Sequence, residues 1–308
     1  MPGWRYVIRK KGTVELASTL CGGCHERIID GRTIAGAPGV SLIPALTSFA
    51  EHRALRAAKN FDAAASDWID RQFALFTVPW LDPDPAAALR KLTIAQILTL
   101  YDKQPSGVAP RPGTSLYFAP KIPDLIGVKD RKYLGATGLD RNSGIEDLMR
   151  YAILETGLDE HTTERLSDAQ VYALIMYIDS FRPPPNENRL DKFAKSGLKI
   201  FEREGCPTCH PGPQYTNDKP IPAETIGTDP RLTTETRKAT GSYLVPSLKN
   251  VWYREPLQHS GASPTLESWF DPVRERGGGE IPPVKGHPFG LKLSFEERQA
   301  LFAFLNTL

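Results

Sequence analysis

The chain has 308 residues, of which 40% are hydrophobic, and its formal net charge is only +2. These values suit a globular protein of two ordinary domains. The balanced charge gives no reason to expect nucleic acid or an acidic membrane as a partner, and no apolar run is long enough to span a bilayer. Residues 1–11 lack the apolar stretch of a secretory signal.

The pattern Cys-x-x-Cys-His occurs at 21–25 and again at 206–210, and these two copies contain all four cysteines. It is the attachment signature of haem c, in which two thiols form thioethers with the haem vinyl groups and the histidine binds the iron. The sequence therefore predicts two covalently attached haem c groups, held by Cys21, Cys24, Cys206 and Cys209, with His25 and His210 as proximal iron ligands.

A Cys-x-x-Cys pair alone would also suit a thioredoxin-like redox site or half of a zinc site. Neither alternative explains a histidine directly after each pair, and a thioredoxin motif rarely occurs twice. The repeated five-residue pattern thus favours haem.

The residues before each motif also correspond. Gly12 and Gly197 lie nine residues before the first cysteine of their motif, and Leu16 and Phe201 lie five before it. We expect both stretches to be short helices that deliver the haem motif.

The first half contains extra sequence near residues 42–104 that the second half lacks. Runs at 46–59, 61–76 and 86–101 have helical character, so we expect a long helical insertion. It could cover the first haem, contact another subunit or be a structural appendage.

A loop follows in each half with six identical residue types at identical spacing. The matched positions are Pro123, Leu125, Val128, Arg131, Leu134 and Gly138 in the first half, and Pro246, Leu248, Val251, Arg254, Leu257 and Gly261 in the second. Trp252, in the second loop, could mediate electron tunnelling between haems or simply pack in the core.

Each half closes with an amphipathic pattern of helical period, over 173–181 and 300–308, behind the candidate N-caps Ser167 and Ser294. We expect these closing helices to pack on the haem-motif helices. Between the halves, residues 183–188 form a proline-rich linker, which divides the chain into domains 1–182 and 189–308.

The second half resembles the C-terminal domain of bacterial dihaem cytochrome c peroxidases, through Val245–Val251, Gln258–Gly261 and the Thr-Leu-Glu at 265–267. The resemblance covers about residues 189–308 and is weaker over 105–181. Quinone-maturing dihaem enzymes and haem rubber oxygenases share this organisation. The resemblance implies an all-α fold of two cytochrome c-like domains, in which one haem relays electrons and the other, usually the N-terminal one, meets peroxide or oxygen.

In these relatives a methionine or tyrosine ligates the C-terminal haem seven residues after the leucine of the Thr-Leu-Glu motif, but Val273 stands there in this chain. Another distal ligand is therefore expected. His287, shortly before Ser294, is the candidate for the second haem, and His161, shortly before Ser167, is the candidate for the first. The alternatives left open are His259 at the second haem and Met149 or His52 at the first.

The leading functional prediction is electron transfer through two haems. The alternative is a peroxidase- or oxygenase-type oxidoreductase with one open-coordination haem and peroxide or oxygen as oxidant. No catalytic residue and no redox partner protein can be named from the sequence. The location is expected to be the periplasm, or otherwise outside the cytoplasm, because bacteria attach haem c there.

Overall fold

The computed structural model describes residues 4–18, 20–40, 77–84, 103–109, 119–156, 166–277 and 283–308, with scattered positions between 87 and 100. Most of the predicted insertion, and the candidate ligands His52 and His161, lie outside the described residues. The elements of the first half are β1 (Trp4–Lys10), β2 (Thr13–Ser18), α1 (Leu20–Cys24), β3 (Glu26–Ile29), β4 (Arg32–Ala35), η1 (Val128–Asp130), β5 (Tyr133–Leu134), β6 (Asp140–Arg141), α6 (Ile145–Thr156) and α7 (Asp168–Asp179).

The second half begins with a long helix and ends with another. Its elements are α8 (Lys192–Arg203), η2 (Cys206–Thr208), β7 (Pro220–Pro222), α9 (Ala223–Ile226), α10 (Arg231–Thr234), β8 (Ser242–Leu244), η3 (Val251–Tyr253), α11 (Leu266–Trp269), η4 (Pro272–Glu275) and α12 (Phe295–Leu305). Within the described ranges, no helix combines the length and apolar character needed to cross a bilayer.

The fold is mixed, so the expectation of an all-α protein is wrong. The described residues form four two-stranded antiparallel sheets in addition to the helices. The hairpin of β3 and β4 shows why, because it turns at Asp30 and Gly31, both with positive φ. An Asp-Gly pair between short runs of β-branched residues is a strong local hairpin signal, and here it determines the structure directly after the first haem motif.

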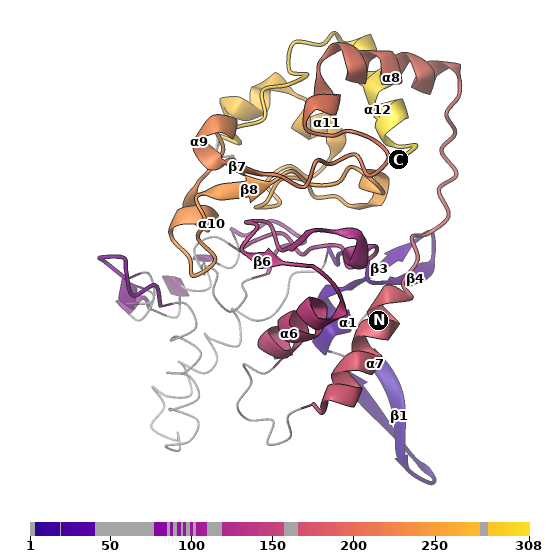
Figure 1. The fold of residues 1–308 in the computed structure, drawn as a ribbon, viewed down its shortest axis with the longest axis vertical. Helices are drawn as coiled ribbons and strands as arrows, with labels where there is room; N and C mark the ends of the chain where they lie inside the picture. The colour runs from indigo at the N-terminus through magenta and orange to yellow at the C-terminus, as the bar shows by residue number, and fades with distance from the viewer. Residues whose placement is uncertain are drawn as a thin grey trace.

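The prediction of a short helix before the first motif is also wrong, because this stretch forms the β1–β2 hairpin. Gly12 lies in its turn with φ +83°, a conformation that glycine adopts without steric cost. The hairpin projects from the body of the molecule, as Figure 1 shows. Gly12 and Gly197 therefore correspond in sequence but not in structure.

In the second half the predicted packing of the closing helix is confirmed, since α12 lies against α8. The two helices approach so closely that a Cβ at Gly197 would lie 1.8 Å from the Ala300 carbonyl oxygen. The rings of Phe201 and Phe304 pack beside this crossing with centroids 5.2 Å apart. In the first half α7 packs on α6 instead, so the prediction fails there.

Both predicted N-caps are confirmed. Ser167 begins α7 in a capping box with Gln170, and Ser294 begins α12 in a capping box with Glu297. Each serine hydroxyl accepts from a backbone N–H that has no partner within the helix, which fixes where the helix begins.

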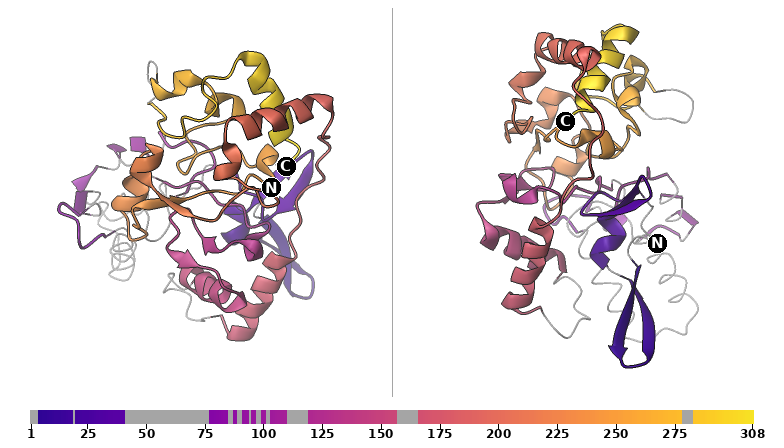
Figure 2. Two further views of the ribbon diagram at one scale, coloured as in Figure 1. Left: turned by 45° about the horizontal axis from the view of Figure 1, so that its top comes forward. Right: turned by 90° about the vertical axis from the view of Figure 1, so that its right-hand side faces the viewer.

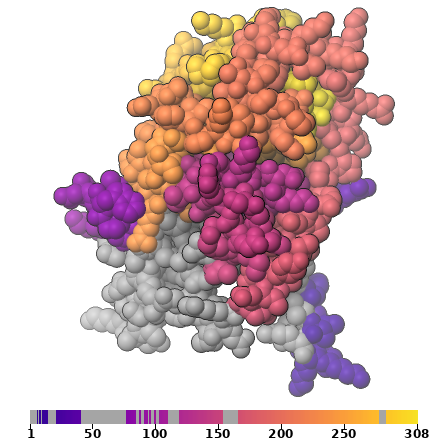
Figure 3. All heavy atoms as spheres, in the orientation of Figure 1, coloured from indigo at the N-terminus to yellow at the C-terminus, as the bar shows by residue number. Residues whose placement is uncertain are grey.

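The two halves form two lobes joined by an extended segment. Residues 182–191 contain no helix or strand and run from α7 in one lobe to α8 in the other, along one side of the molecule in Figures 1 and 2. In the space-filling view of Figure 3 the two lobes meet along a broad front across the middle of the molecule.

The repeated loops form this junction in a nearly symmetric way. In one direction the backbone N–H of Leu244 donates to the carbonyl of Ala136, and in the other Lys121 donates to His259, both over 2.8 Å. Leu244 is the repeat equivalent of Lys121, and His259 is the repeat equivalent of Ala136. The sequence repeat therefore acts as a pairing surface between the halves.

Candidate haem centres

Each Cys-x-x-Cys-His motif folds into one tight turn. The backbone N–H of His25 donates to the carbonyl of Cys21 over 2.8 Å, and that of His210 donates to Cys206 over 2.9 Å. This turn places two thiols and the following imidazole on one short stretch of backbone. It is the local geometry that thioether attachment and proximal ligation of one haem require.

A backbone carbonyl lies behind each of these imidazoles. Nδ1 of His25 lies 3.1 Å from the Pro123 oxygen, and Nδ1 of His210 lies 3.0 Å from the Tyr215 oxygen. The Pro246 carbonyl also raises the pKa of His210, and Pro246 is the repeat equivalent of Pro123. A carbonyl accepts a hydrogen, so Nδ1 carries the proton and Nε2 keeps the lone pair that binds a metal.

Burial also favours the neutral form of the histidine in the second motif. The His210 side chain is almost wholly enclosed, and burial lowers its pKa. Burial also raises the pKa of the Cys206 thiol to about 11, which is the opposite of the lowered pKa that a thioredoxin-like nucleophile needs. The zinc alternative needs several His, Cys, Asp or Glu side chains close together. Among the described residues, no group of three such side chains is arranged to hold a metal ion.

The walls of the second centre are apolar, as a porphyrin requires. Phe201, Leu266, Phe270 and Leu301 belong to one buried cluster in this lobe. Residues packed against that cluster include Cys206, Tyr215, Leu248, Leu257 and Trp269. The residues present therefore fit a covalently held haem.

The structure brings His287 to this centre. Its ring lies among those of Trp269, Phe270 and Phe289, with centroids 5.3, 6.5 and 5.4 Å away. Burial, with smaller contributions from the nearby His210 and Arg274, lowers the pKa of His287 to about 4. Its Nδ1 is buried and has no hydrogen-bond partner among the described residues. The two imidazoles thus belong to one enclosed site.

Arg274 holds the loop that carries His287. Its side chain donates to the carbonyls of Trp269 (2.6 Å), Val284 (2.6 Å), Gly286 (2.8 Å) and His287 (2.9 Å). The guanidinium also lies over the Trp269 ring, 4.3 Å from its centroid. His287 itself has φ +53°, a backbone conformation that non-glycine residues rarely adopt. Sequence reasoning missed Arg274, because nothing in the sequence distinguishes it from a surface arginine.

His259 lies at the junction of the repeated loops. Its ring stacks on Tyr243 with centroids 4.0 Å apart, and its carbonyl accepts from Lys121. Burial lowers its pKa to about 4, while the nearby Asp229 opposes this shift. These described contacts connect His259 to the interface between the halves rather than to the proximal His210.

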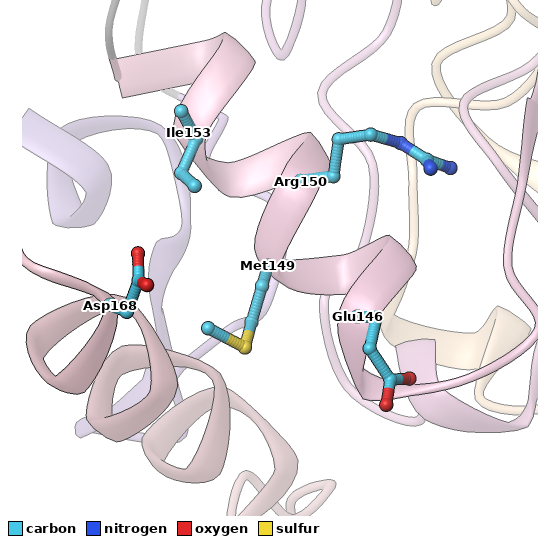
Figure 4. A pocket seen from close by; sticks show the side chains of 5 residues that line it. All are labelled: Glu146, Met149, Arg150, Ile153 and Asp168. Atoms are coloured by element: carbon cyan, nitrogen blue, oxygen red, sulfur yellow. The ribbon is translucent and has the colours of Figure 1, made fainter.

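Met149 packs on α6 against the small core of the first lobe, which includes Leu148 and Ile175. It also lines a pocket of about 330 Å³ with Glu146, Arg150, Ile153 and Asp168. Figure 4 shows the Met149 side chain pointing from α6 toward α7. No residue of a haem motif lines this pocket, so the structure gives Met149 a packing role.

Comparison with known proteins agrees with this chemistry. No protein-family model matches the chain. Cytochrome-c peroxidase IdrP1 of Pseudomonas sp. (strain SCT) is 27% identical over a segment that covers 40% of this chain and 41% of that protein. The chain is related to the dihaem cytochrome c peroxidase superfamily.

The match spans well under half the length of IdrP1. Among solved structures, the chain is similar to a MauG-like protein associated with microbial copper homeostasis. The TM-score is 0.45 and the identity 17%, over 66% of this chain and 78% of that one.

Proposed function

We propose that the chain is a c-type cytochrome that holds two haems and transfers electrons through them. The supporting observation is the shared geometry of the two motifs. In each, a histidine N–H closes a turn onto the first cysteine, and a backbone carbonyl orients the imidazole. Haem c supplies one-electron redox chemistry when bound, and this chain's contribution is to hold and orient its iron ligands.

For the second haem we assign His210 as proximal and His287 as distal ligand. The buried His287 lies close enough to His210 for His210 to add to the lowering of its pKa, which burial mainly causes. Two neutral imidazoles, those of His210 and His287, would hold the iron, and such ligation gives a lower potential than methionine does. A closed second haem suits electron relay rather than binding of a substrate.

For the first haem we assign His25 as proximal ligand, and His161 as the proposed distal ligand from its sequence position alone. If the first haem instead lacks a sixth ligand, the protein would reduce peroxide or activate oxygen there. The name of its relative, a cytochrome-c peroxidase, favours this second candidate function. Hydrogen peroxide would then be the oxidant, and a separate redox protein would supply the electrons.

We place the protein in the periplasm, or otherwise outside the cytoplasm, because bacteria attach haem c there. Cell fractionation with detection of covalent haem in the periplasmic fraction checks this assignment.

One spectrum separates the two candidate functions. The resting ferric protein is examined by electronic absorption and by electron paramagnetic resonance. Purely low-spin signals from both haems support the electron carrier, whereas a high-spin signal from one haem supports the peroxidase-type enzyme. Peroxide-dependent oxidation of a reduced cytochrome c then measures the enzymatic activity directly.

A further inference from the structure

The β1–β2 hairpin lies away from the rest of the described structure. Its strands pair with one another along Trp4–Lys10 and Thr13–Ser18, and no other described element packs on either strand to a comparable extent. The hairpin extends beyond the body of the molecule in the perpendicular views of Figures 1 and 2. An isolated two-stranded hairpin is only marginally stable in water, so a surface that covers it would stabilise it.

Three apolar side chains of the hairpin are exposed to water. Tyr6 is 80% exposed, Ile8 is 70% exposed and Val14 is 62% exposed. Tyr6 and Ile8 are more exposed than any other large hydrophobic residue that the structure describes. Contact of apolar surface with water is unfavourable, so the hairpin gains free energy wherever an apolar phase can receive these side chains.

The register of the hairpin puts these side chains on one face. Tyr6 pairs with Leu16, and Val14 lies two residues from Leu16 along β2. Ile8 lies two residues from Tyr6 along β1, and the register shift that follows Val7 leaves Ile8 opposite Val14. Residues two apart in a strand point to the same face, so the three exposed side chains form one apolar face.

The hairpin is also basic. Arg5, Arg9, Lys10 and Lys11 lie in β1 or its turn, and Glu15 is the one acidic residue between positions 4 and 18. This local excess of positive charge is larger than the formal net charge of the whole chain, which is +2. The side chains of Lys10 and Lys11 are exposed at the turn. The tip of the hairpin therefore presents cations beside the apolar face.

This combination distinguishes between possible partners. The cations at the tip would repel the same tip of a second copy, so the hairpin is poorly suited to pair with itself. An anionic lipid membrane supplies both complements at once, because its surface carries negative charge and its apolar acyl region lies directly beneath. A projecting tip can also reach a planar surface without interference from the body of the molecule.

We propose that the β1–β2 hairpin binds the surface of an anionic lipid membrane. Tyr6, Ile8 and Val14 enter the boundary between headgroups and acyl chains, and Lys10 and Lys11 contact lipid phosphates. Such insertion is shallow, so it needs none of the spanning helices that the described ranges lack. The inference goes beyond the proposed haem function and does not depend on it. With haem bound, the contact would hold the redox centres near partners embedded in the membrane.

Sedimentation with lipid vesicles tests this proposal on the unaltered full chain. One vesicle population is phosphatidylcholine alone, and the other contains an equal share of phosphatidylglycerol, which adds negative charge. The chain should bind the neutral vesicles about tenfold more weakly than the anionic ones, or weaker still. Added salt should reduce binding to the anionic vesicles, because ions screen exposed charges.

A charge variant and its control locate the electrostatic contact. Lys10→Gln combined with Lys11→Gln should weaken binding to the anionic vesicles about 25-fold, since each cation near such a surface contributes about fivefold. Lys195→Gln combined with Lys199→Gln makes the same change in charge on exposed positions of α8 and should leave binding unchanged.

An apolar variant tests insertion separately. Ile8→Ser should weaken binding to the anionic vesicles about tenfold, because a large side chain no longer leaves water on binding. Leu190→Ser is the control, since Leu190 is 45% exposed and lies outside the hairpin. All of the replaced side chains are exposed, so the variants should fold, and circular dichroism with denaturation midpoints checks that they do.

Two results with vesicles would overturn the proposal. If the unaltered chain does not bind the anionic vesicles, the membrane is not the partner and the hairpin is left to a protein. If both hairpin variants bind as tightly as the parent, the membrane contact lies elsewhere. Analytical ultracentrifugation without lipid examines the remaining occupant. A concentration-dependent dimer that Ile8→Ser abolishes would show that a second copy covers the apolar face, which also overturns the membrane assignment.

Discussion

The phenolic hydroxyl of Tyr253 donates to Oδ2 of Asp124 over 3.0 Å, and this bond joins the repeated loops of the two halves. Both side chains are buried, with 3% and 2% of their surfaces exposed. Burial and the neighbouring carboxylate raise the pKa of Tyr253, so the phenol stays protonated and remains a donor. The contact lies one residue after Pro123, whose carbonyl orients His25.

Replacing Tyr253 by Phe should destabilise the protein by about 1–3 kcal/mol, because the buried Asp124 loses a donor to its charged oxygen. Chemical denaturation of the loaded protein measures the loss. Tyr177→Phe serves as control, since Tyr177 is 58% exposed, and should change the midpoint little. Equal midpoints for the two variants would mean that the bond does not stabilise the junction.

Replacing Cys206 and Cys209 together by Ala should halve the covalent haem content, because the second haem loses both thioether bonds. Pyridine haemochrome assay per mole of protein gives this ratio. The double variant of Cys21 and Cys24 should give the same half value. A content that stays at two haems per chain in either variant would disprove attachment at that motif.

Replacing His287 by Ala should open the second haem to added ligands such as cyanide or imidazole and raise its potential, because an imidazole that stabilises ferric iron is lost. Absorption spectra and redox titration follow both effects. His259→Asn is the matched control, since this histidine stacks on Tyr243 and should leave both quantities unchanged. If His287→Ala leaves the spectrum unchanged, His287 is not a ligand of the iron.

Arg274 should act by positioning His287. In Arg274→Lys the charge remains but most of the four carbonyl contacts are lost, so the His287 loop should loosen and a high-spin fraction should appear. Arg274→Gln, which removes the charge as well, should show the same spin change. If both variants stay fully low-spin at normal haem content, the arginine stabilises the lobe without positioning the ligand.

His259 should make stability depend on pH. Burial lowers its pKa from the ordinary 6.5 to about 4, so the unfolded chain takes up the proton first as the pH falls through this window. The folded state should lose up to about 3 kcal/mol between pH 6.5 and 4 from this residue. Denaturation of His259→Asn at several pH values should show a flatter acid loss. Parallel curves for variant and parent protein would show that His259 is not responsible.

The sequence by itself determined the local chemistry. The spacing of Cys206, Cys209 and His210 can be met by a single turn of backbone, so a short segment is enough to specify the haem motif. The caps Ser167 and Ser294 were predictable for the same reason, because a cap depends on residues only three positions apart. The Asp30-Gly31 turn is equally local, and the hairpin that it forms is one reason why the all-α expectation is wrong.

Only the tertiary structure determined which residues, distant in sequence, lie close to these motifs. It placed His287 beside His210, showed that Arg274 holds the His287 loop, and joined Asp124 to Tyr253. These relationships depend on side chains separated by tens of residues or more, which no local pattern specifies. A buried cation such as Lys121 reads in sequence as an ordinary surface lysine, because the burial that changes its charge exists only after the two halves have packed together.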